Sequence, residues 1–247
     1  MGRFYVPPEA VKGKTVIISG REAHHIINVM RLKRSDGVVT FDGSGREYAG
    51  IIKDIRGKTV EVEIISTREP VRGTGLQVTL VQALPKKEKM DYIVEKGTEL
   101  GVASIIPVMT ERTIVDWDGP RRQGAVARWR KIATEAAKQC GRADIPLIAD
   151  VTELKGFFNA PPERDAGIIA ALSEDAAPLK EVLGAYRSAR RISVLIGPEG
   201  DFTPHEIKEA KDKKFRVVNL GPRVLKSDTA GLAVLAIIDY ELSGRTV

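Results

Sequence analysis

The sequence predicts an α/β protein in which a small N-terminal β-barrel precedes a larger domain built on a parallel sheet. Short β-rich runs separated by turn residues fill residues 1–70, as is typical of a small barrel. From residue 76 onward, strands alternate with helices, which favours a parallel sheet covered by helices. The segment 69–75, EPVRGTG, has the proline and glycines of a linker. We therefore expect two domains, at residues 1–70 and 76–247.

The composition is that of a soluble globular protein. The chain has 247 residues, 43% of them hydrophobic and 29% charged. No apolar run approaches a membrane-spanning length, and the N-terminus lacks the apolar centre of a signal peptide. The single cysteine, Cys140, excludes an intrachain disulfide and favours a cytoplasmic location; it ends an apolar helical stripe and is expected in the core. Three histidines and one cysteine without ligand spacing predict no metal site.

The charge predicts an anionic partner. The net charge is +6, and residues 1–72 carry 13 basic against 9 acidic residues, while the remaining residues carry 26 against 24. The N-terminal part is therefore the more basic per residue. Nucleic acid is the leading interpretation, and a soluble protein that happens to be basic is the alternative.

In the N-terminal part, strands are expected at 3–6, 15–18, 38–41, 48–55 and 59–65. A helix over 21–30 interrupts them and runs into Arg31-Leu32-Lys33-Arg34, which holds three cations. We predict an RNA-contacting edge here, although solvated charges are the alternative at every position. The predicted contacts are Arg3, His25, Arg31, Lys33 and Arg34, together with Lys86, Lys87 and Lys89 of the second domain.

In the second domain, strands are expected at 78–83, 104–109, 145–149, 167–172, 192–196 and 216–220. Helices are expected at 86–100, 121–140 and 153–158, from Pro204 onward, and at 228–242 with Asp228 as cap. The last helix is apolar nearly all round from Leu232 to Ile238, so it must be covered by the sheet and by a partner subunit. Burial within one large domain is the alternative.

Three loops that follow strands predict a ligand site. They are 171–174, Gly197-Pro198-Glu199-Gly200, and 220–225. The second loop leads into Thr203-Pro204-His205-Glu206, which has the pattern of a capping box. In a parallel sheet these loops converge at the carboxyl edge, where ligands bind. Neither a GxxxxGK nor a GxGxxG motif is present, so a nucleoside-like ligand without phosphates fits best. A β-branched residue at Gly200 would be strained if its φ is positive. An ordinary tight turn is the alternative for this loop taken alone.

Motifs along the whole chain resemble one known family. LIGPEGDFTPHE, LGPRVLKSDTAGLAVL, KKEKMDYIVEKGTELGV and EAAKQCGR, with RFYV and HHIINVMRLKRSDGV near the N-terminus, are similar to the ribosomal RNA small subunit methyltransferase E (RsmE) family of the SPOUT class. The resemblance implies a trefoil-knotted domain behind a PUA-like barrel. It also implies S-adenosylmethionine (SAM) as methyl donor and a homodimer with the active site near the subunit interface. The implied reaction is N3 methylation of a uridine in 16S rRNA.

Carried over by position, the resemblance implies a SAM pocket lined by Leu172, Ile196, Gly197, Pro198, Glu199, Gly200, Leu220, Gly221, Val224 and Leu225. Two departures stand out. Lys226-Ser227-Asp228 replaces the usual arginine-threonine-glutamate, and lysine lacks the bidentate fork of arginine. Asp201 stands where glycine is common and changes the charge at the pocket rim.

A uridine N3 must lose its proton before it can accept a methyl group. A carboxylate could take the proton, and a cation could stabilise the negative charge that develops. Glu199 is the expected base and Asp228 the second candidate, with Arg142 as the cation. Favourable placement near a helix N-terminus is the alternative for Glu199. Because N3 lies on the pairing edge, a paired target would have to be unpaired or flipped. Two other functions stay open: a knotted methyltransferase acting on tRNA, and a non-catalytic RNA-binding module.

Overall fold

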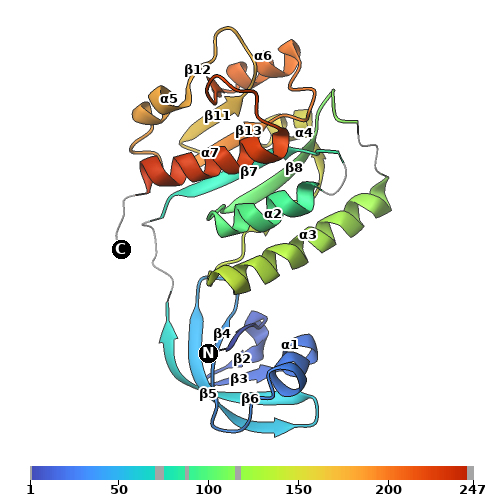
Figure 1. Ribbon diagram of the computed structural model, residues 1–247, viewed down its shortest axis with the longest axis vertical. Helices are drawn as coiled ribbons and strands as arrows, with labels where there is room; N and C mark the ends of the chain where they lie inside the picture. The colour runs from blue at the N-terminus through green and yellow to red at the C-terminus, as the bar shows by residue number, and fades with distance from the viewer. Residues whose placement is uncertain (1, 70–74, 87–88, 115–117, 244–247) are drawn as a thin grey trace. The chain divides into compact units, whose positions relative to one another are not determined.

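The computed structural model describes residues 2–69, 75–86, 89–114 and 118–243 (Figure 1). Residues 70–74 of the expected linker therefore lie outside the described part. The chain divides into two compact units, Met1–Gly73 with Thr134–Ile145 and Thr74–Ala133 with Pro146–Val247. A β-rich N-terminal unit and a parallel-sheet unit covered by helices confirm the predicted fold class.

The first unit is built on a six-stranded sheet in the order β1-β4-β5-β6-β3-β2. β1 runs parallel to β4, and the other pairs are antiparallel. The strands are β1 (Gly2–Tyr5), β2 (Val11–Lys12), β3 (Thr15–Ile18), β4 (Gly37–Phe41), β5 (Glu47–Arg56) and β6 (Thr59–Arg68), and a short 3-10 turn, η1, covers Pro8–Ala10. Alternate residues point into one apolar core that contains Phe4, Val16, Val38 and Ile52. This period of two is the pattern that made the strands predictable.

The helix expected at 21–30 is only partly α-helical. α1 covers Gly20–His24, and a π-helix, η2, continues over His25–Val29. The chain then turns back, with the Leu32 amide donating to the Ile26 carbonyl and Arg31 at a φ of 54°. Glycine is the usual residue in such a left-handed helix end. The wider turn leaves Val29 61% and Met30 40% exposed.

The second unit contains an all-parallel sheet in the order β10-β8-β7-β13-β11-β14-β12, with β9 also paired to β8. The strands are β7 (Gln77–Ala83), β8 (Ser104–Met109), β9 (Leu147–Ile148), β10 (Thr152–Glu153), β11 (Ala166–Ala170), β12 (Ala177–Pro178), β13 (Arg191–Ile196) and β14 (Arg216–Asn219). The central strands β13 and β11 are buried along most of their length, which explains their continuous apolar sequences.

Helices cover both faces of this sheet (Figure 1). α4 (Leu154–Asn159) and α6 (Pro204–Asp212) enclose one core, in which Phe157, Phe158 and Phe215 pack together. On the other face α7 (Ser227–Leu242) contacts α2 (Lys89–Glu99), α5 (Leu179–Ala185) and the strands β7 and β13. α3 spans Gly119–Cys140. Its buried Trp129 donates from Nε1 to Asp91 of α2 at 2.9 Å.

Several expectations about the elements from residue 76 onward need correction. The strand expected at 145–149 shortens to β9, and the helix α5 was not predicted. Cys140 is exposed because it is the last residue of α3, beyond the buried part of the stripe. α7 buries Val234, Leu235 and Ile238 but leaves Ile237 38% exposed. Complete burial of this helix within one chain, the alternative considered above, is therefore wrong.

Candidate functional site

The loops after β11, β13 and β14 meet at the carboxyl edge of the parallel sheet and enclose a cavity of about 250 Å³. Of the ten residues predicted for a pocket, nine line this cavity, and Gly200 does not. Ala171 and Arg223 also line it, as members of the predicted loops, and so does Asp201, which was expected at the rim, whereas Ala170, Val218, Asn219, Lys226, Ser227 and Ala230 were not assigned to it. Most of these residues sit beside assigned ones in the same loops, so loop membership was the signal that could have found them.

The turn after β13 owes its shape to a residue other than the one expected. Gly200 does not have a positive φ, whereas Asp201 has a φ of 59°. A Cβ atom at Gly200 would meet nothing closer than Cβ of Arg112, at 3.4 Å. At Gly197 a Cβ atom would lie 3.2 Å from both Oδ1 of Asp201 and Cδ2 of Phe202. Gly197 is therefore the crowded position of this loop, and the strain expected at Gly200 is absent.

The helix after this turn begins as the sequence predicted. The Thr203 hydroxyl accepts from the Glu206 amide at 3.2 Å, and the Glu206 carboxylate accepts from the Thr203 amide at 2.8 Å, with Pro204 as the first helical residue. The second carboxylate oxygen of the buried Glu206 accepts from the Glu111 amide at 2.9 Å. The capping box is thereby confirmed, and it also anchors the segment that follows β8.

The start of α7 is held by a buried hydrogen-bond network and not by a side-chain cap. The Ser227 hydroxyl donates to the Gly197 carbonyl at 2.5 Å and accepts from Nε2 of Gln82 on β7 at 2.9 Å. Lys226 is the N-cap residue, and no side chain caps the helix, so the expected Asp228 cap is wrong. These hydrogen bonds connect the start of α7 to Gly197, which lines the cavity, and to Gln82 on β7.

The two carboxylates predicted as bases lie on either side of one lysine. Nζ of Lys89 is 3.1 Å from Oε1 of Glu199 and 3.6 Å from Oδ1 of Asp228. Glu199 also accepts from the Lys86 amide at 3.2 Å. Burial alone would raise the pKa of Glu199, but hydrogen bonds from its own amide, from Lys89 and from Lys86 outweigh it and lower the pKa. The hydrogen bond to Glu199 raises the pKa of Lys89. Lys89, predicted to contact RNA, thus belongs to this acidic cluster.

The expected catalytic cation, Arg142, belongs to the unit that does not contain the cavity. Arg142 belongs to the first unit and does not line the cavity, which is built entirely from the second unit. Its Nη2 lies 2.5 Å from Oδ2 of Asp144. Burial alone would raise the pKa of Asp144, but the hydrogen bond from Arg142, the charge of Arg142 and a backbone hydrogen bond together outweigh it and lower the pKa. The role of Arg142 as the catalytic cation stays a prediction.

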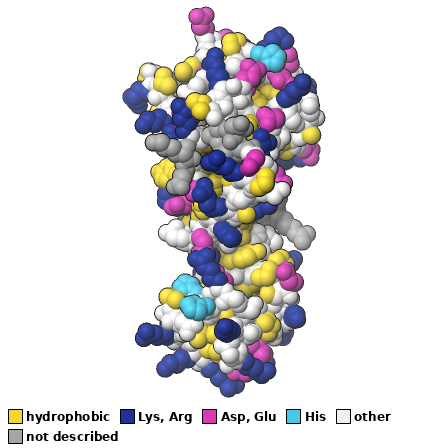
Figure 2. Space-filling model, turned by 90° about the vertical axis from the view of Figure 1, so that its right-hand side faces the viewer, with side chains coloured by type: hydrophobic (Ala, Val, Ile, Leu, Met, Phe, Trp, Pro, Cys, Tyr) yellow, Lys and Arg dark blue, Asp and Glu magenta, His cyan; other side chains and the backbone are white. Residues whose placement is uncertain are grey.

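The predicted RNA contacts of the first unit fall into two groups. Arg3 pairs with Glu47 and stacks over Phe41, and His25 packs edge-on against Phe4, so both have structural neighbours. Arg31, Lys33 and Arg34 are exposed, and in the described part of the chain none of them forms an ion pair. Figure 2 shows Lys and Arg side chains spread over the surface of this unit. Lys86 is exposed, and Lys87 lies outside the described residues.

Metal-binding clusters and membrane-spanning helices are both absent from the described residues. No set of three or more His, Cys, Asp or Glu side chains in the described ranges is grouped so that it could hold a metal ion. None of the described helices combines the length and apolar character needed to span a membrane.

Two family models match the chain. One, described as an RNA methyltransferase domain, matches residues 73–239. The other, described as an RNA methyltransferase PUA domain, matches residues 18–65.

Relatives and solved structures match along nearly the whole chain. Ribosomal RNA small subunit methyltransferase E from Bacillus subtilis is 29% identical over 98% of this chain and 97% of its own length. The protein of that name from Synechocystis is 31% identical over 96% of this chain and 77% of its own length. The crystal structure of ribosomal RNA small subunit methyltransferase E from Neisseria gonorrhoeae, bound to S-adenosyl methionine, matches with 29% identity and a TM-score of 0.85. That match covers 97% of each chain.

Proposed function

The chain belongs to the RNA methyltransferase family, within the ribosomal RNA small subunit methyltransferase E group, and from this premise we propose that it methylates N3 of a uridine in 16S rRNA with SAM as donor. The observation that carries the proposal is the cavity formed by three loops at the carboxyl edge of the sheet. The Neisseria gonorrhoeae relative, with the same fold over nearly its whole length, is bound to SAM.

The residues around the cavity fit such a ligand. Leu172 and Val224 are large apolar side chains that line the cavity, yet they are 67% and 75% exposed. A ligand with a flat apolar part would remove this surface from water, which is a favourable contribution. Glu199 adds a carboxylate for a ligand that carries positive charge. Leu172, Ile196, Gly197, Pro198, Leu220, Gly221, Val224 and Leu225 would hold the donor.

When bound, SAM supplies a methyl group on a sulfonium sulfur, which keeps the electron pair of the broken carbon–sulfur bond. The protein must therefore remove the N3 proton and align the uridine. Of the two candidate bases, Asp228 is the one proposed to take this proton. Its Oδ1 is buried and, within the described residues, accepts no hydrogen bond, although the Lys89 ammonium lies 3.6 Å away. Glu199 is occupied by the Lys86 amide and the Lys89 ammonium, which lower its pKa and make it a weak base.

Lys89 is the cation proposed here for the reaction, since Arg142 does not line the cavity. Its ammonium lies between Glu199 and Asp228, and both carboxylates favour its charged form. As Asp228 takes the N3 proton, negative charge spreads over the uracil ring until the new N–C bond forms. A positive charge held beside the base lowers the energy of that charge distribution.

The test of the function is methyl transfer from labelled SAM to three substrates: assembled small ribosomal subunits, free rRNA and tRNA. We expect label in small-subunit rRNA and none in tRNA, with the label at N3 of a uridine after nuclease digestion. Label in tRNA alone would contradict the proposal, and so would SAM binding without any transfer.

Residues 1–70 bind the RNA around the target, and residues 76–247 bind the donor and carry out the transfer. Arg31, Lys33 and Arg34 are the proposed contacts, since exposed cations without acidic partners release counterions when they bind phosphates. We expect the triple substitution of these residues by alanine to weaken RNA binding and to flatten its salt dependence. SAM affinity should stay unchanged. Filter binding at several salt concentrations and calorimetry with SAM would measure the two effects.

Two controls separate specific contacts from general charge. Alanine at Lys12, Lys14 and Lys58, three exposed cations elsewhere on the same unit, removes equal charge and should weaken RNA binding much less. Arg31→Gly relieves the left-handed backbone at this position. It should therefore preserve or raise the melting temperature while it weakens RNA binding. Equal losses from both triple variants would show that only net charge matters.

The exposed strip of α7 supports a homodimer. Ile237 and Tyr240 of α7 are 38% and 69% exposed, and Tyr92 of the adjacent α2 is 51% exposed. A second copy of the chain would cover this surface, and obligate dimer interfaces are large and hydrophobic. We expect light scattering to give the dimer mass at micromolar concentration and Ile237→Lys to shift it toward the monomer. Leu147→Lys, at an equally apolar but separate position that is 66% exposed, should leave the dimer intact.

A further inference from the structure

Asp201 occupies a backbone position that favours glycine. Its φ of 59° lies in the left-handed region, which side chains with a Cβ atom disfavour and which Asp tolerates better than most. A residue in such a strained conformation is stabilised by its surroundings, so the contacts of its side chain are informative.

The Asp201 carboxylate connects two of the three loops that form the cavity. Its Oδ2 accepts from the Leu172 amide at 2.8 Å, in the loop after β11. Its Oδ1 accepts from the Phe202 amide, also at 2.8 Å, in its own loop after β13. Both oxygens are thus directed to backbone amides of the protein. The carboxylate therefore fixes the spacing of the two loops at the cavity rim.

Arg112 holds the same turn from another side. This residue follows β8, and its Nη1 donates to the Gly200 carbonyl at 2.8 Å and reaches the Phe202 carbonyl at 3.5 Å. These carbonyls belong to the two neighbours of Asp201. Two sets of hydrogen bonds therefore hold Asp201 in its left-handed conformation. Its own carboxylate bonds to the Leu172 amide, and Arg112 bonds to the carbonyls of the residues on either side of it.

We propose that Asp201 and Arg112 form a clamp that positions the loops after β11 and β13 before the donor binds. The inference rests on the proposed function, because it concerns the same cavity. The two residues are positioning residues: they act through the loops, and the donor would meet a pocket whose shape is already set. Preorganisation of this kind raises affinity because less freedom is lost on binding.

The experiment measures binding of SAM and of its demethylated product, S-adenosylhomocysteine, by calorimetry, together with the melting temperature. The variants are Asp201→Gly, Asp201→Asn and Arg112→Ala. Asp201→Gly suits the left-handed backbone, so folding should be preserved while the link to Leu172 is lost. We expect about tenfold weaker binding of both ligands, as for the loss of a charge-assisted hydrogen bond. Asp201→Asn should retain part of the affinity, because one amide oxygen can still accept.

The two ligands distinguish a clamp from direct charge recognition. S-adenosylhomocysteine lacks the sulfonium charge, so a carboxylate that contacted this charge directly would affect SAM alone. The clamp predicts equal losses for both ligands. It also predicts that the double variant Asp201→Gly with Arg112→Ala loses less than the product of the two single effects, since the residues act as one unit.

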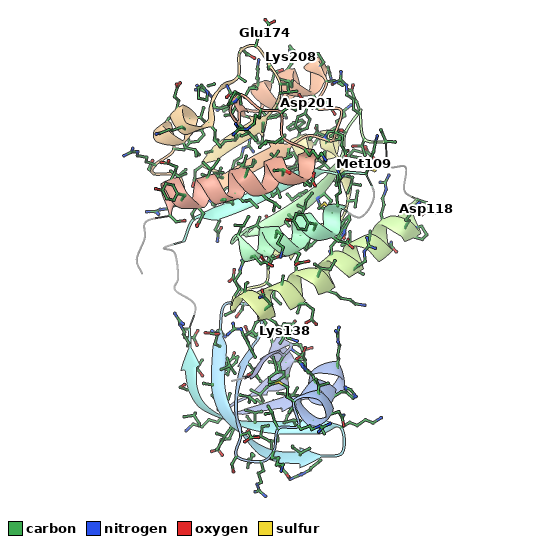
Figure 3. All side chains as sticks on the ribbon, in the orientation of Figure 1. Met109, Asp118, Lys138, Glu174, Asp201 and Lys208 are labelled. Atoms are coloured by element: carbon green, nitrogen blue, oxygen red, sulfur yellow. The ribbon has the colours of Figure 1, made fainter. Side chains whose placement is uncertain are left out.

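Glu174→Gln is the matched control, because this exposed carboxylate is in the loop after β11 and points outward at the top of Figure 3, where Asp201 is also labelled. It should bind both ligands as the unchanged protein does. Unchanged affinity of Asp201→Gly would overturn the clamp, and so would a loss confined to SAM. If the unchanged protein bound neither ligand, the proposed function itself would fail and the clamp with it.

Discussion

Gly197→Val is expected to weaken SAM binding by at least about tenfold and by as much as about a hundredfold, the range that overpacking of a fitted site produces. A Cβ atom at this position would lie 3.2 Å from Oδ1 of Asp201 and 3.3 Å from Cα of Asp201, and valine adds two methyl groups beyond it. The Gly197 carbonyl also accepts from Ser227. The substitution would therefore push apart the loop after β13 and the start of α7.

Gly200→Val is the control for this prediction, because it lies in the same turn and receives the same side chain. Its Cβ atom would make only ordinary contacts with Arg112, and its φ is not positive. We expect SAM affinity within about threefold of the unchanged protein, in keeping with a substitution outside the packed site. Calorimetry on both variants, after circular dichroism has established folding, decides the matter. Stronger damage from Gly200→Val would mean that the donor approaches the outer side of the turn.

Asp228→Asn is expected to lower the rate of methyl transfer at saturating substrates by about a hundredfold or more, the usual contribution of a positioned base. Asparagine keeps the shape of the side chain but cannot take the N3 proton. SAM affinity should hardly change, because the backbone and apolar walls of the cavity remain. Single-turnover kinetics with bound SAM would isolate this step.

Glu199→Gln provides the comparison. Its carboxylate holds the Lys86 amide and the Lys89 ammonium, so we expect a smaller loss of rate together with weaker SAM binding. Asp228→Glu should keep a substantial part of the activity because it retains the carboxylate. If Glu199→Gln lost the rate and Asp228→Asn did not, Glu199 would be the base after all.

The strands and most helices were predictable because local patterns specify them. In the first unit apolar and polar residues alternate along the strands, because only one face of the sheet is buried. In the second unit the strands are continuously apolar, because both faces are buried. Both patterns can be recognised in the sequence. The capping box at Thr203 is equally local. The π-helix at 25–29 was not predictable, since the residues fit an α-helical stripe and only the packing of the unit selects the wider turn.

The site was predictable as a set of loops but not as a set of roles. Gly197 and Leu225 could be placed because strand order brings their loops to one edge. The role of Lys89 could not be read from a lysine-rich stretch, because its partners Glu199 and Asp228 are more than a hundred residues away. The ion pair between Arg142 and Asp144, two residues apart, was not predicted either, because it depends on how the chain turns after α3. The sequence showed that Asp201 replaces a common glycine. Its hydrogen bonds to the Leu172 and Phe202 amides could be identified only in the folded chain.

The sheet order of the second unit also determines when the cavity can form. β7 pairs with β13, so Gln77 must find Arg191 across more than a hundred residues. Such distant parallel pairings close large loops and are slow to form. The cavity further needs Ser227 and Ala230, near the end of the 247-residue chain. Because the ribosome makes the chain from its N-terminus, the six strands of the first unit emerge long before the donor pocket can close. The β-rich unit can therefore fold before the residues that complete the donor pocket have been synthesised.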